Sequence, residues 1–413
     1  MYIQLQQIKK QLNYRKTQRS FETLPLGSAM KFRRKELNMT LEETAENLIS
    51  ISYLSKLENN LIKPNMKYIK LFEERLKMKF DQHNYDHNYH HQINQVFLSL
   101  HHDEKIEEEL LNQYKQKQNH QSFLFVMAHY VSSNQFDKIK PYYENLKSYI
   151  PNLLNDEIIL FFTCVTIILI SEERFLDAYE VIKLIPKTEE ENILIESIKL
   201  KYRLKCVIGL MRPSEVEKVY HQYVSNLQIM HAFDQLYKTQ IEYFVYKTSQ
   251  HNIEKIEERL NKIPAMDSMD RSYILALCYY HSGNYEKSLF LSQSYIDSHE
   301  KWLILHIMSL DHLHREDDIK GIIQQKESFV FSKRSDRLIF RYIEFKHFND
   351  TKCVLSYLRE LLTNRYLLTD NYHTLSYIYK DAAALFGQHF YYKEAHQTLH
   401  QWFIVQKTLT KSS

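Results

Sequence analysis

The chain has 413 residues, and its 54 Lys and Arg against 51 Asp and Glu leave a net charge of only +3. This total conceals a split. Residues 1–80 hold 16 basic and 8 acidic residues, a net charge of +8, and the remaining residues hold 38 and 43, a net charge of −5. A basic head on a mildly acidic body predicts that the head, and not the body, meets a polyanion.

Glycine is scarce, with 5 in the whole chain and no two of them close together. This excludes the glycine-rich phosphate loops and the G-x-S-x-G turn of many hydrolases. Many short strands joined by tight turns would also need more glycine. The chain has only 7 prolines, so long helices with brief connections remain and we predict an all-α fold. The acidic residues form charged helix faces and not a positioned acid/base pair, so we do not expect an enzyme.

The four cysteines lie far apart and beside apolar residues, which predicts reduced, buried thiols in a cytoplasmic protein; they are Cys164, Cys206, Cys278 and Cys353. The N-terminal residues carry charge but no following apolar region, so we do not expect a signal peptide. The longest apolar run, residues 158–170, has 13 residues and is shorter than the roughly 18–20 that cross a bilayer. We therefore expect a buried core helix there and no contact with a membrane.

Histidine is abundant, and two groups of histidines are candidate metal sites. Neither group has an acidic or cysteine ligand at a metal-site spacing, so we expect solvated or partly buried imidazoles, no metal and no cofactor. The groups are His87, His90 and His91, and His306, His312 and His314.

Residues 26–76 contain a compact series of helix signals. Ser28 is a candidate N-cap, Thr40 and Glu43 have the spacing of a capping box, and Ser50 can cap the helix that follows. We predict helices at residues 29–37, 41–47 and 51–58 and after Pro64-Asn65. The predicted inward residues are Met30, Leu37, Ala45, Leu54, Leu57, Ile69, Leu71, Phe72 and Leu76.

This stretch, LGSAMKFRRKELNMTLEETAENLISISYLSKLENNLIKPN, resembles the Cro/repressor-type (XRE) helix-turn-helix over about 50 residues. Leu41 replaces the usual Gln at the start of the second helix. Asn60 replaces the usual Gly, although Asn also tolerates a left-handed backbone. The resemblance implies a DNA-binding domain of four to five helices, which we place at residues 24–80.

In such domains the third helix lies in the major groove, and its N-terminal residues face the base edges. The residues predicted to read bases are Ser50, Ile51, Ser52, Tyr53, Ser55 and Lys56. The residues predicted to contact phosphates without reading sequence are Lys31, Arg33, Arg34, Lys35, Thr40, Lys63 and Lys67. Residues 1–23 form a basic extension, and two alternatives stay open for it: an arm along the DNA backbone, or an amphipathic or unstructured segment without a role in binding.

From residue 81 onward, apolar helical stretches alternate with short polar breaks. We predict a helical linker at 81–119 and a repeat domain at 120–413. A polar turn recurs with a mean interval of about 37 residues, close to the period of the tetratricopeptide repeat. Residues 271–296 are the copy that most resembles that family, and the others are degenerate. The predicted turns begin at residues 134, 173, 214, 251, 283, 317, 351 and 391, and we expect about eight helix pairs in a right-handed superhelix.

A Cro/repressor-type domain followed by such repeats resembles the bacterial regulators of the Rgg, PlcR, NprR and PrgX types. The resemblance implies that the body binds a short signalling peptide, dimerises and alters how the head engages double-stranded DNA. Two alternatives stay open: a Rap-like protein that binds or dephosphorylates a response regulator, and a ligand-independent repressor of a phage or mobile element.

Two further expectations follow. A head this small reads one half-site, so we expect a homodimer on an operator with two half-sites, joined through the apolar C-terminal residues 402–405. We expect the peptide in a concave groove lined by the first helices of the pairs. Its predicted residues are Ile241, Val245, Tyr273, Leu277, Tyr280, Ile307, Asp311, His314, Arg341 and Lys380, with Asp311 for a peptide amine and Arg341 and Lys380 for a carboxylate.

Overall fold

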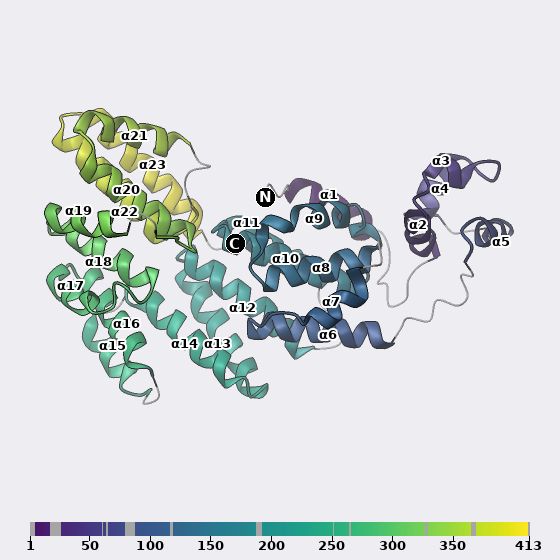
Figure 1. Ribbon diagram of the computed structural model, residues 1–413, viewed down its shortest axis with the longest axis horizontal. Coiled ribbons are helices and arrows are strands. Elements are labelled where there is room, and N and C mark those ends of the chain that lie inside the picture. Colours follow the sequence, from purple (N-terminus) through teal and green to yellow (C-terminus); the bar gives the residue numbers. More distant parts are fainter. Residues whose placement is uncertain are drawn as a thin grey trace. The chain divides into compact units, whose positions relative to one another are not determined.

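The computed structural model shows an all-helical protein (Figure 1). Within the described ranges every regular element is a helix and none is a strand, so the predicted fold class is confirmed. The residues that the structure describes are 5–16, 26–59, 61–62, 65–78, 87–115, 119–186, 192–250, 252–263, 266–326, 329–364 and 369–411.

The N-terminal part contains one helix in front of the head, the four helices of the head and two more helices. These are α1 (Leu5–Lys16), α2 (Leu26–Glu36), α3 (Leu41–Ala45), α4 (Ile51–Glu58), α5 (Met66–Arg75), α6 (His87–His102) and α7 (Glu108–Lys115).

Eight helix pairs follow, as the repeat pattern predicts. They are α8 (His120–Ser132) with α9 (Lys140–Lys147), α10 (Asn155–Ser171) with α11 (Phe175–Ile182), α12 (Ile193–Gly209) with α13 (Pro213–Ile229), α14 (Phe233–Lys247) with α15 (Ile253–Leu260), α16 (Ser268–His281) with α17 (Tyr285–Gln293), α18 (Glu300–His312) with α19 (Glu316–Gln325), α20 (Arg334–Phe348) with α21 (Thr351–Thr363), and α22 (Tyr372–Gln388) with α23 (Tyr392–Thr410). Two short 3₁₀ helices, η2 (Phe136–Lys138) and η3 (Ile150–Asn152), lie before and after α9.

A left-handed backbone residue recurs in the turn within these pairs. Gly283 has a φ of 79° between α16 and α17, and non-glycine residues take the same conformation elsewhere, such as Asn134 between α8 and α9 and Phe390 between α22 and α23. Asp103, between α6 and α7, has a φ of 59° as well. The scarcity of glycine therefore did not limit such turns: among the described residues, ten non-glycine residues have a positive φ.

The chain divides into two compact units. Unit 1 contains Met1–Ile168 and Asp177–Tyr202, and unit 2 contains Leu169–Leu176 and Arg203–Ser413. The head and the first helix pairs thus belong to one unit, whereas the boundaries that the sequence suggested at residues 80 and 119 stay predictions.

Within unit 1, helix α1 packs against η3. Its Ile8 and Leu12 are buried, and the Lys9 ammonium lies 3.1 Å from the Glu180 carboxylate. Of the two alternatives for the extension, these contacts favour an amphipathic segment that packs on the protein. Residues 17–23 lie outside the described ranges.

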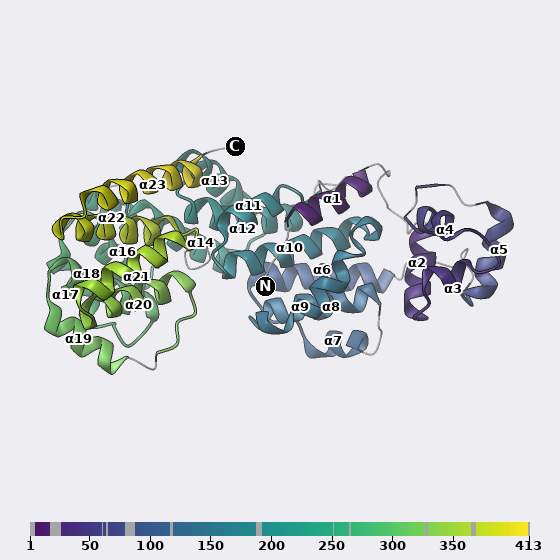
Figure 2. The ribbon, with the colours of Figure 1, turned by 90° about the horizontal axis from the view of Figure 1, so that it is seen from above.

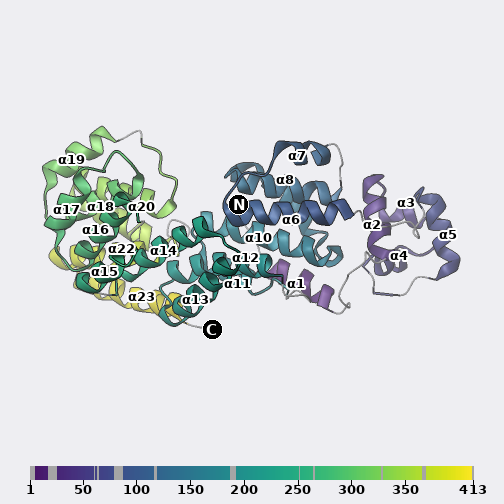
Figure 3. The same cartoon turned by 90° about the horizontal axis from the view of Figure 1, so that it is seen from below.

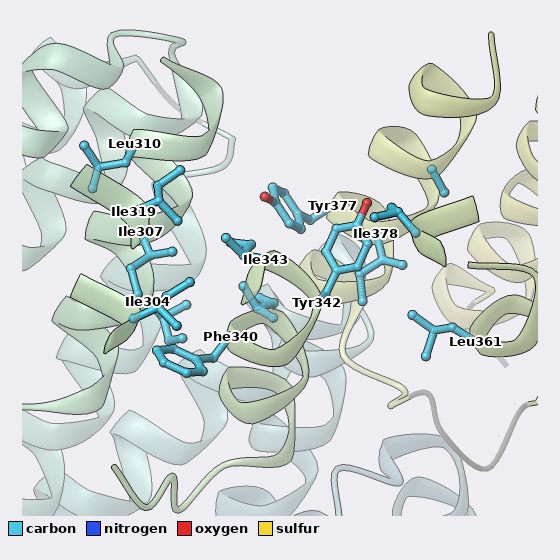
Figure 4. Close-up of a cluster of buried hydrophobic side chains, with 14 of the residues drawn as sticks. Ile304, Ile307, Leu310, Ile319, Phe340, Tyr342, Ile343, Leu361, Tyr377 and Ile378 are labelled. Carbon is cyan, nitrogen blue, oxygen red and sulfur yellow. The ribbon is translucent and has the colours of Figure 1, made fainter. Parts of the chain in front are cut away.

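One hydrophobic cluster of unit 2 extends over several successive helix pairs, from α17 to α22. Ile304 and Ile307 of α18 pack with Phe340 of α20, and Tyr377 of α22 continues the same cluster (Figure 4). The last two helices, α22 and α23, lie side by side (Figure 2). Each pair buries its apolar side against its neighbour, as expected for a helical repeat array.

Burial decides the state of the cysteines and of the longest apolar helix. Cys164, Cys206 and Cys278 are buried thiols, but Cys353 is exposed near the start of α21, so the prediction of buried thiols is wrong for this one. The apolar run lies in α10 and is buried as predicted. No helix in the described ranges is both long and apolar enough to span a membrane.

Two of the helical glycines, Gly209 and Gly321, differ in the space around them and so allow a stability prediction. A Cβ on Gly209 would lie 2.7 Å from the ring of Phe175, whereas nothing lies within 4 Å of one on Gly321 in α19. We expect Gly209→Ala to destabilise the protein by about 1–3 kcal/mol through overpacking. Gly321→Ala should stabilise it by about 0.5–1 kcal/mol, since alanine favours helix. Thermal unfolding of both variants checks this, and equal melting temperatures would contradict the close contact.

Candidate DNA-reading head and peptide-binding face

The head consists of α2 to α5 (Figure 3). These helices enclose one small apolar core. The Thr40 hydroxyl accepts from the Glu43 N–H and the Glu43 carboxylate accepts from the Thr40 N–H, which confirms the capping box. The Ser50 hydroxyl accepts from the Tyr53 N–H at 3.2 Å and caps α4, also as predicted. The buried core residues are Ala29, Met30, Ala45, Leu54, Leu57, Phe72 and Leu76.

Two predictions about the helices of the head, one on capping and one on packing, are wrong. Ser28 does not cap the first helix, because α2 already begins at Leu26 and Ser28 is fully buried within it. Leu71 does not face inward, since 38% of its surface is exposed.

Helix α4 presents its N-terminal end to solvent. Ile51, Ser52 and Lys56 are exposed, together with the capping Ser50. Ser52 and Lys56 are four residues apart and therefore neighbours on one helix face. Tyr53 and Ser55 are half-buried, and the Tyr53 ring packs edge-on against Tyr68 at 6.2 Å. The structure thus brings four of the six predicted base-reading residues to one exposed surface.

Arg34 points into the protein instead of toward a phosphate. Its guanidinium forms a two-pronged ion pair with the Glu58 carboxylate, at 2.6 and 2.8 Å, and donates to the Met39 carbonyl at 2.8 Å. Both charged side chains are buried. The predicted phosphate contact does not hold for Arg34 in this conformation, because the pair ties α2 to the end of α4.

The other predicted phosphate residues divide by exposure. Arg33 donates to the Leu76 carbonyl at 3.0 Å and to Glu36. The ammonium of Lys31 is buried, and that of Lys35 contacts Ser148 at 2.9 Å. Burial, added to the charges of neighbouring basic residues, lowers the pKa of each of these two lysines to about 8. Thr40 and Lys67 are exposed, and Lys63 lies outside the described residues.

One contact within the head was not predicted from the sequence. The Arg75 guanidinium of α5 donates to the carbonyls of Thr44 and Glu46, at 3.2 and 2.5 Å, and so closes the end of α3. A basic residue in the last turn of a helix is too common a pattern to indicate this partner.

The predicted peptide-binding residues fall into three groups. Five lie half-buried on α14 and α16: Ile241, Val245, Tyr273, Leu277 and Tyr280. Three are exposed: His314 in the turn after α18, Arg341, which pairs with Glu344 at 2.8 Å, and Lys380.

The remaining two, Ile307 and Asp311, are buried, and the prediction does not hold for them. Ile307 is a core residue with no exposed surface. The Asp311 carboxylate accepts from the Lys346 ammonium, from His347 at 2.6 Å and from the Tyr377 hydroxyl at 2.5 Å. Burial opposes ionisation, but the hydrogen bond from His347 and the charge of Lys346 outweigh it and hold the pKa of Asp311 well below its ordinary value. Its amine-binding capacity is already used inside the protein.

Lys346 extends this arrangement into a polar network between α18, α20 and α22. Its ammonium lies 3.0 Å from both Asp311 and Asp381, and Asp381 also accepts from the Tyr342 hydroxyl. Tyr342 of α20 and Tyr377 of α22 are also members of the apolar cluster (Figure 4). The network joins residues up to 70 positions apart, so no local spacing pattern could have found it.

Next to the network, aromatic and imidazole rings gather on α16, α18 and α22 and at the start of α17. The Tyr280 hydroxyl hydrogen-bonds with His312 Nε2 at 3.0 Å, and His312 stacks on Tyr285 with a centroid separation of 4.4 Å. The rings of His281 and His373, from α16 and α22, lie 5.3 Å apart. Burial lowers the pKa of His281 to about 3 and that of His373 to about 4. Both residues are nevertheless exposed to solvent, so they are neutral side chains on a partly enclosed surface.

Two comparisons with known proteins bear on these regions. A helix-turn-helix family model matches residues 30–82, so the head is a helix-turn-helix domain, as its resemblance to the Cro/repressor type implied. A search of curated proteins found no match.

The second match is to the crystal structure of a Rap protein complexed with competence and sporulation factor. It covers 78% of this chain and 98% of that chain, with a TM-score of 0.57 and 13% sequence identity. At this identity the match establishes the fold. The predicted architecture, a helix-turn-helix head with tetratricopeptide-like repeats, is confirmed.

The buried ion pair predicts the effect of removing Arg34. Arg34→Ala leaves the Glu58 charge buried and uncompensated, which should cost the head about 3–5 kcal/mol. The exposed Lys70 of α5 is a matched control, and Lys70→Ala should change stability by less than about 0.5 kcal/mol. Hydrogen exchange of residues 26–59 measures both. If Arg34→Ala exchanges like the control and only weakens DNA binding, Arg34 is a phosphate contact after all.

Proposed function

We propose that the protein is a sequence-specific DNA-binding transcription regulator whose repeat domain binds a short signalling peptide and which acts as a homodimer in the cytoplasm. The observation that carries this proposal is one chain with two parts: a helix-turn-helix head with an exposed reading helix and a repeat domain with the Rap fold. The head supplies a surface for DNA, and the repeats supply a surface for an extended ligand.

The DNA part of the proposal rests on the exposed end of α4. Ser50, Ser52 and Lys56 can hydrogen-bond to base edges, and Ile51 can pack on a thymine methyl. Lys67 and Thr40 are exposed on the same head and supply phosphate contacts. Lys31, Arg34 and Lys35 make internal contacts instead, so the proposed phosphate set is smaller than the sequence suggested.

Dimerisation is proposed through α23. Leu399, Phe403 and Ile404 of this last helix each expose half or more of their surface. Trp402 does not belong to this surface, because it is buried and stacks on Tyr379. These large apolar residues lie on α23 of the last helix pair, and a second copy of the protein can cover them.

The base-reading role of Lys56 has a direct test. A duplex enriched from a random-sequence pool by the full-length protein serves as the operator. Lys56→Ala should weaken binding to it by about 1–3 kcal/mol and leave binding to random DNA nearly unchanged. Lys70 is exposed on α5. Lys70→Ala is the matched control and should change neither the affinity for the operator nor that for random DNA.

Two outcomes of that experiment count against the proposal. Equal losses on operator and random DNA would remove the base-reading role of Lys56. Light scattering of the operator complex should find two chains per duplex, and a single chain on a duplex with two half-sites would exclude the dimer.

The peptide part rests on the ring cluster around Tyr280. Tyrosine and neutral imidazole side chains offer flat apolar area together with hydrogen-bonding tips. The exposed cations Arg341 and Lys380 remain candidates for a peptide carboxylate. We no longer assign Asp311 to a peptide amine, because its carboxylate is already paired with Lys346.

Removal of one aromatic ring tests the peptide-binding face. Synthetic peptides from the C-terminal parts of small reading frames beside the gene are the probes, and calorimetry measures their affinity. Tyr280→Ala should weaken a peptide that binds by about tenfold or more, since a buried aromatic anchor is worth about 2 kcal/mol. The control Phe290→Ala removes an equally large ring, 76% exposed on the neighbouring helix α17, and should change nothing. Equal affinities in both variants would place the ligand elsewhere.

The Rap fold favours one alternative, a protein that binds or dephosphorylates a response regulator. In that case the repeats would hold a protein partner and the head would be secondary. Loss of the aspartyl phosphate from a purified response regulator on addition of this protein, without binding of selected DNA, would favour this alternative.

A further inference from the structure

A single asparagine of the first helix pairs directs its whole side chain into the head. Asn152 in η3 has no exposed surface. Its Nδ2 donates to the Ser28 hydroxyl at 3.0 Å and to the Glu58 carbonyl at 2.8 Å, and its Oδ1 accepts from the Lys31 ammonium at 2.6 Å. Both N–H donors and the acceptor of the carboxamide are therefore used by residues more than 90 positions earlier in the chain.

The contact with Glu58 reaches the reading helix itself. The last carbonyl groups of a helix have no partner within it, and Glu58 is the last residue of α4. Asn152 supplies that partner. The Lys31 ammonium also donates to the Oδ1 of Asn59, the C-cap of α4, at 3.1 Å, so α2 and α4 both meet at Asn152.

Aromatic stacking surrounds this polar centre. Phe32 of α2 stacks on His120 of α8 with a centroid separation of 3.7 Å, and the Lys35 ammonium lies 3.7 Å from the centre of the Tyr149 ring. His120 is held in turn by the fully buried Glu157, 3.1 Å from its Nε2. Hydrogen bonds at Asn152, together with the ring contacts around it, fix the orientation of the head on α8 and η3.

We propose that Asn152 is a positioning residue that fixes the direction in which the helix pairs present the reading helix α4. The head and helices α8 to η3 then move as one body, and the head is not held by a flexible tether alone. This inference rests on the proposed function, because it assigns the junction a role in operator binding.

The first experiment varies the spacing of the operator. On the selected duplex, lengthening or shortening the distance between half-sites by about two base pairs rotates one half-site by roughly 70°. Wild-type protein should lose about tenfold or more in affinity. Asn152→Leu keeps the size of the side chain and removes its hydrogen bonds. It should bind the original spacing about tenfold more weakly than wild type, with only about twofold dependence on spacing, because a tethered head lowers the effective concentration.

Single half-site binding and a matched variant separate positioning from folding. Asn145→Leu is the control, since Asn145 is exposed and its side-chain amide donates to the Pro141 carbonyl within α9. The affinity for one isolated half-site should be the same in wild type and both variants. A spacing profile of Asn152→Leu as steep as that of wild type would overturn the proposal.

A second measurement needs no DNA. Hydrogen exchange in the full chain should rise in residues 26–36 and 53–59 for Asn152→Leu and stay unchanged for Asn145→Leu. Unchanged exchange in Asn152→Leu would overturn the junction. If wild-type protein selects no DNA, the proposed function fails, the role in operator spacing fails with it, and raised exchange would leave Asn152 as the residue that docks the head.

Discussion

The structure depends on one constraint: a pair of helices can bury only part of its apolar surface within itself. The remaining apolar side has to be covered by the next pair along the chain. In unit 2 this produces a continuous core in which Leu303 of α18, Ile343 of α20 and Ile378 of α22 belong to one cluster. Within unit 2, the first helices of successive pairs from α14 to α22 therefore lie next to one another.

That arrangement decides which polar groups are left for a ligand. A charged group between packed helices has to be paired inside the protein, and Asp311, Lys346 and Asp381 satisfy one another in this way. Groups nearer to solvent escape the requirement. His281 and His373 reach solvent, and they are better placed than Asp311 to meet the proposed peptide.

The head follows the same rule with a different result. Its basic residues would all serve DNA if charge alone decided, but Arg34 is needed to neutralise Glu58 inside the domain, and Lys31 is buried against Asn59 and Asn152. The exposed N-terminal end of α4 is what remains for base edges. The end of α4 that we propose to read bases is thus exposed, while its other end is bonded to η3.

Local patterns were sufficient for the elements of this fold. Capping by Thr40 and Ser50, the spacing of apolar residues and the recurrent polar turns depend on neighbours within a few positions, so the sequence alone predicted the helices, the helix-turn-helix and the eight pairs. Glycine content did not indicate which turns have a left-handed residue, because residues such as Asn134 adopt that backbone too. The pairing of Arg34, Lys31 and Asp311 was decided by tertiary structure only. Whether a charge faces solvent or a partner more than 20 positions away depends on how helices pack, and a one-dimensional pattern holds no distance between them.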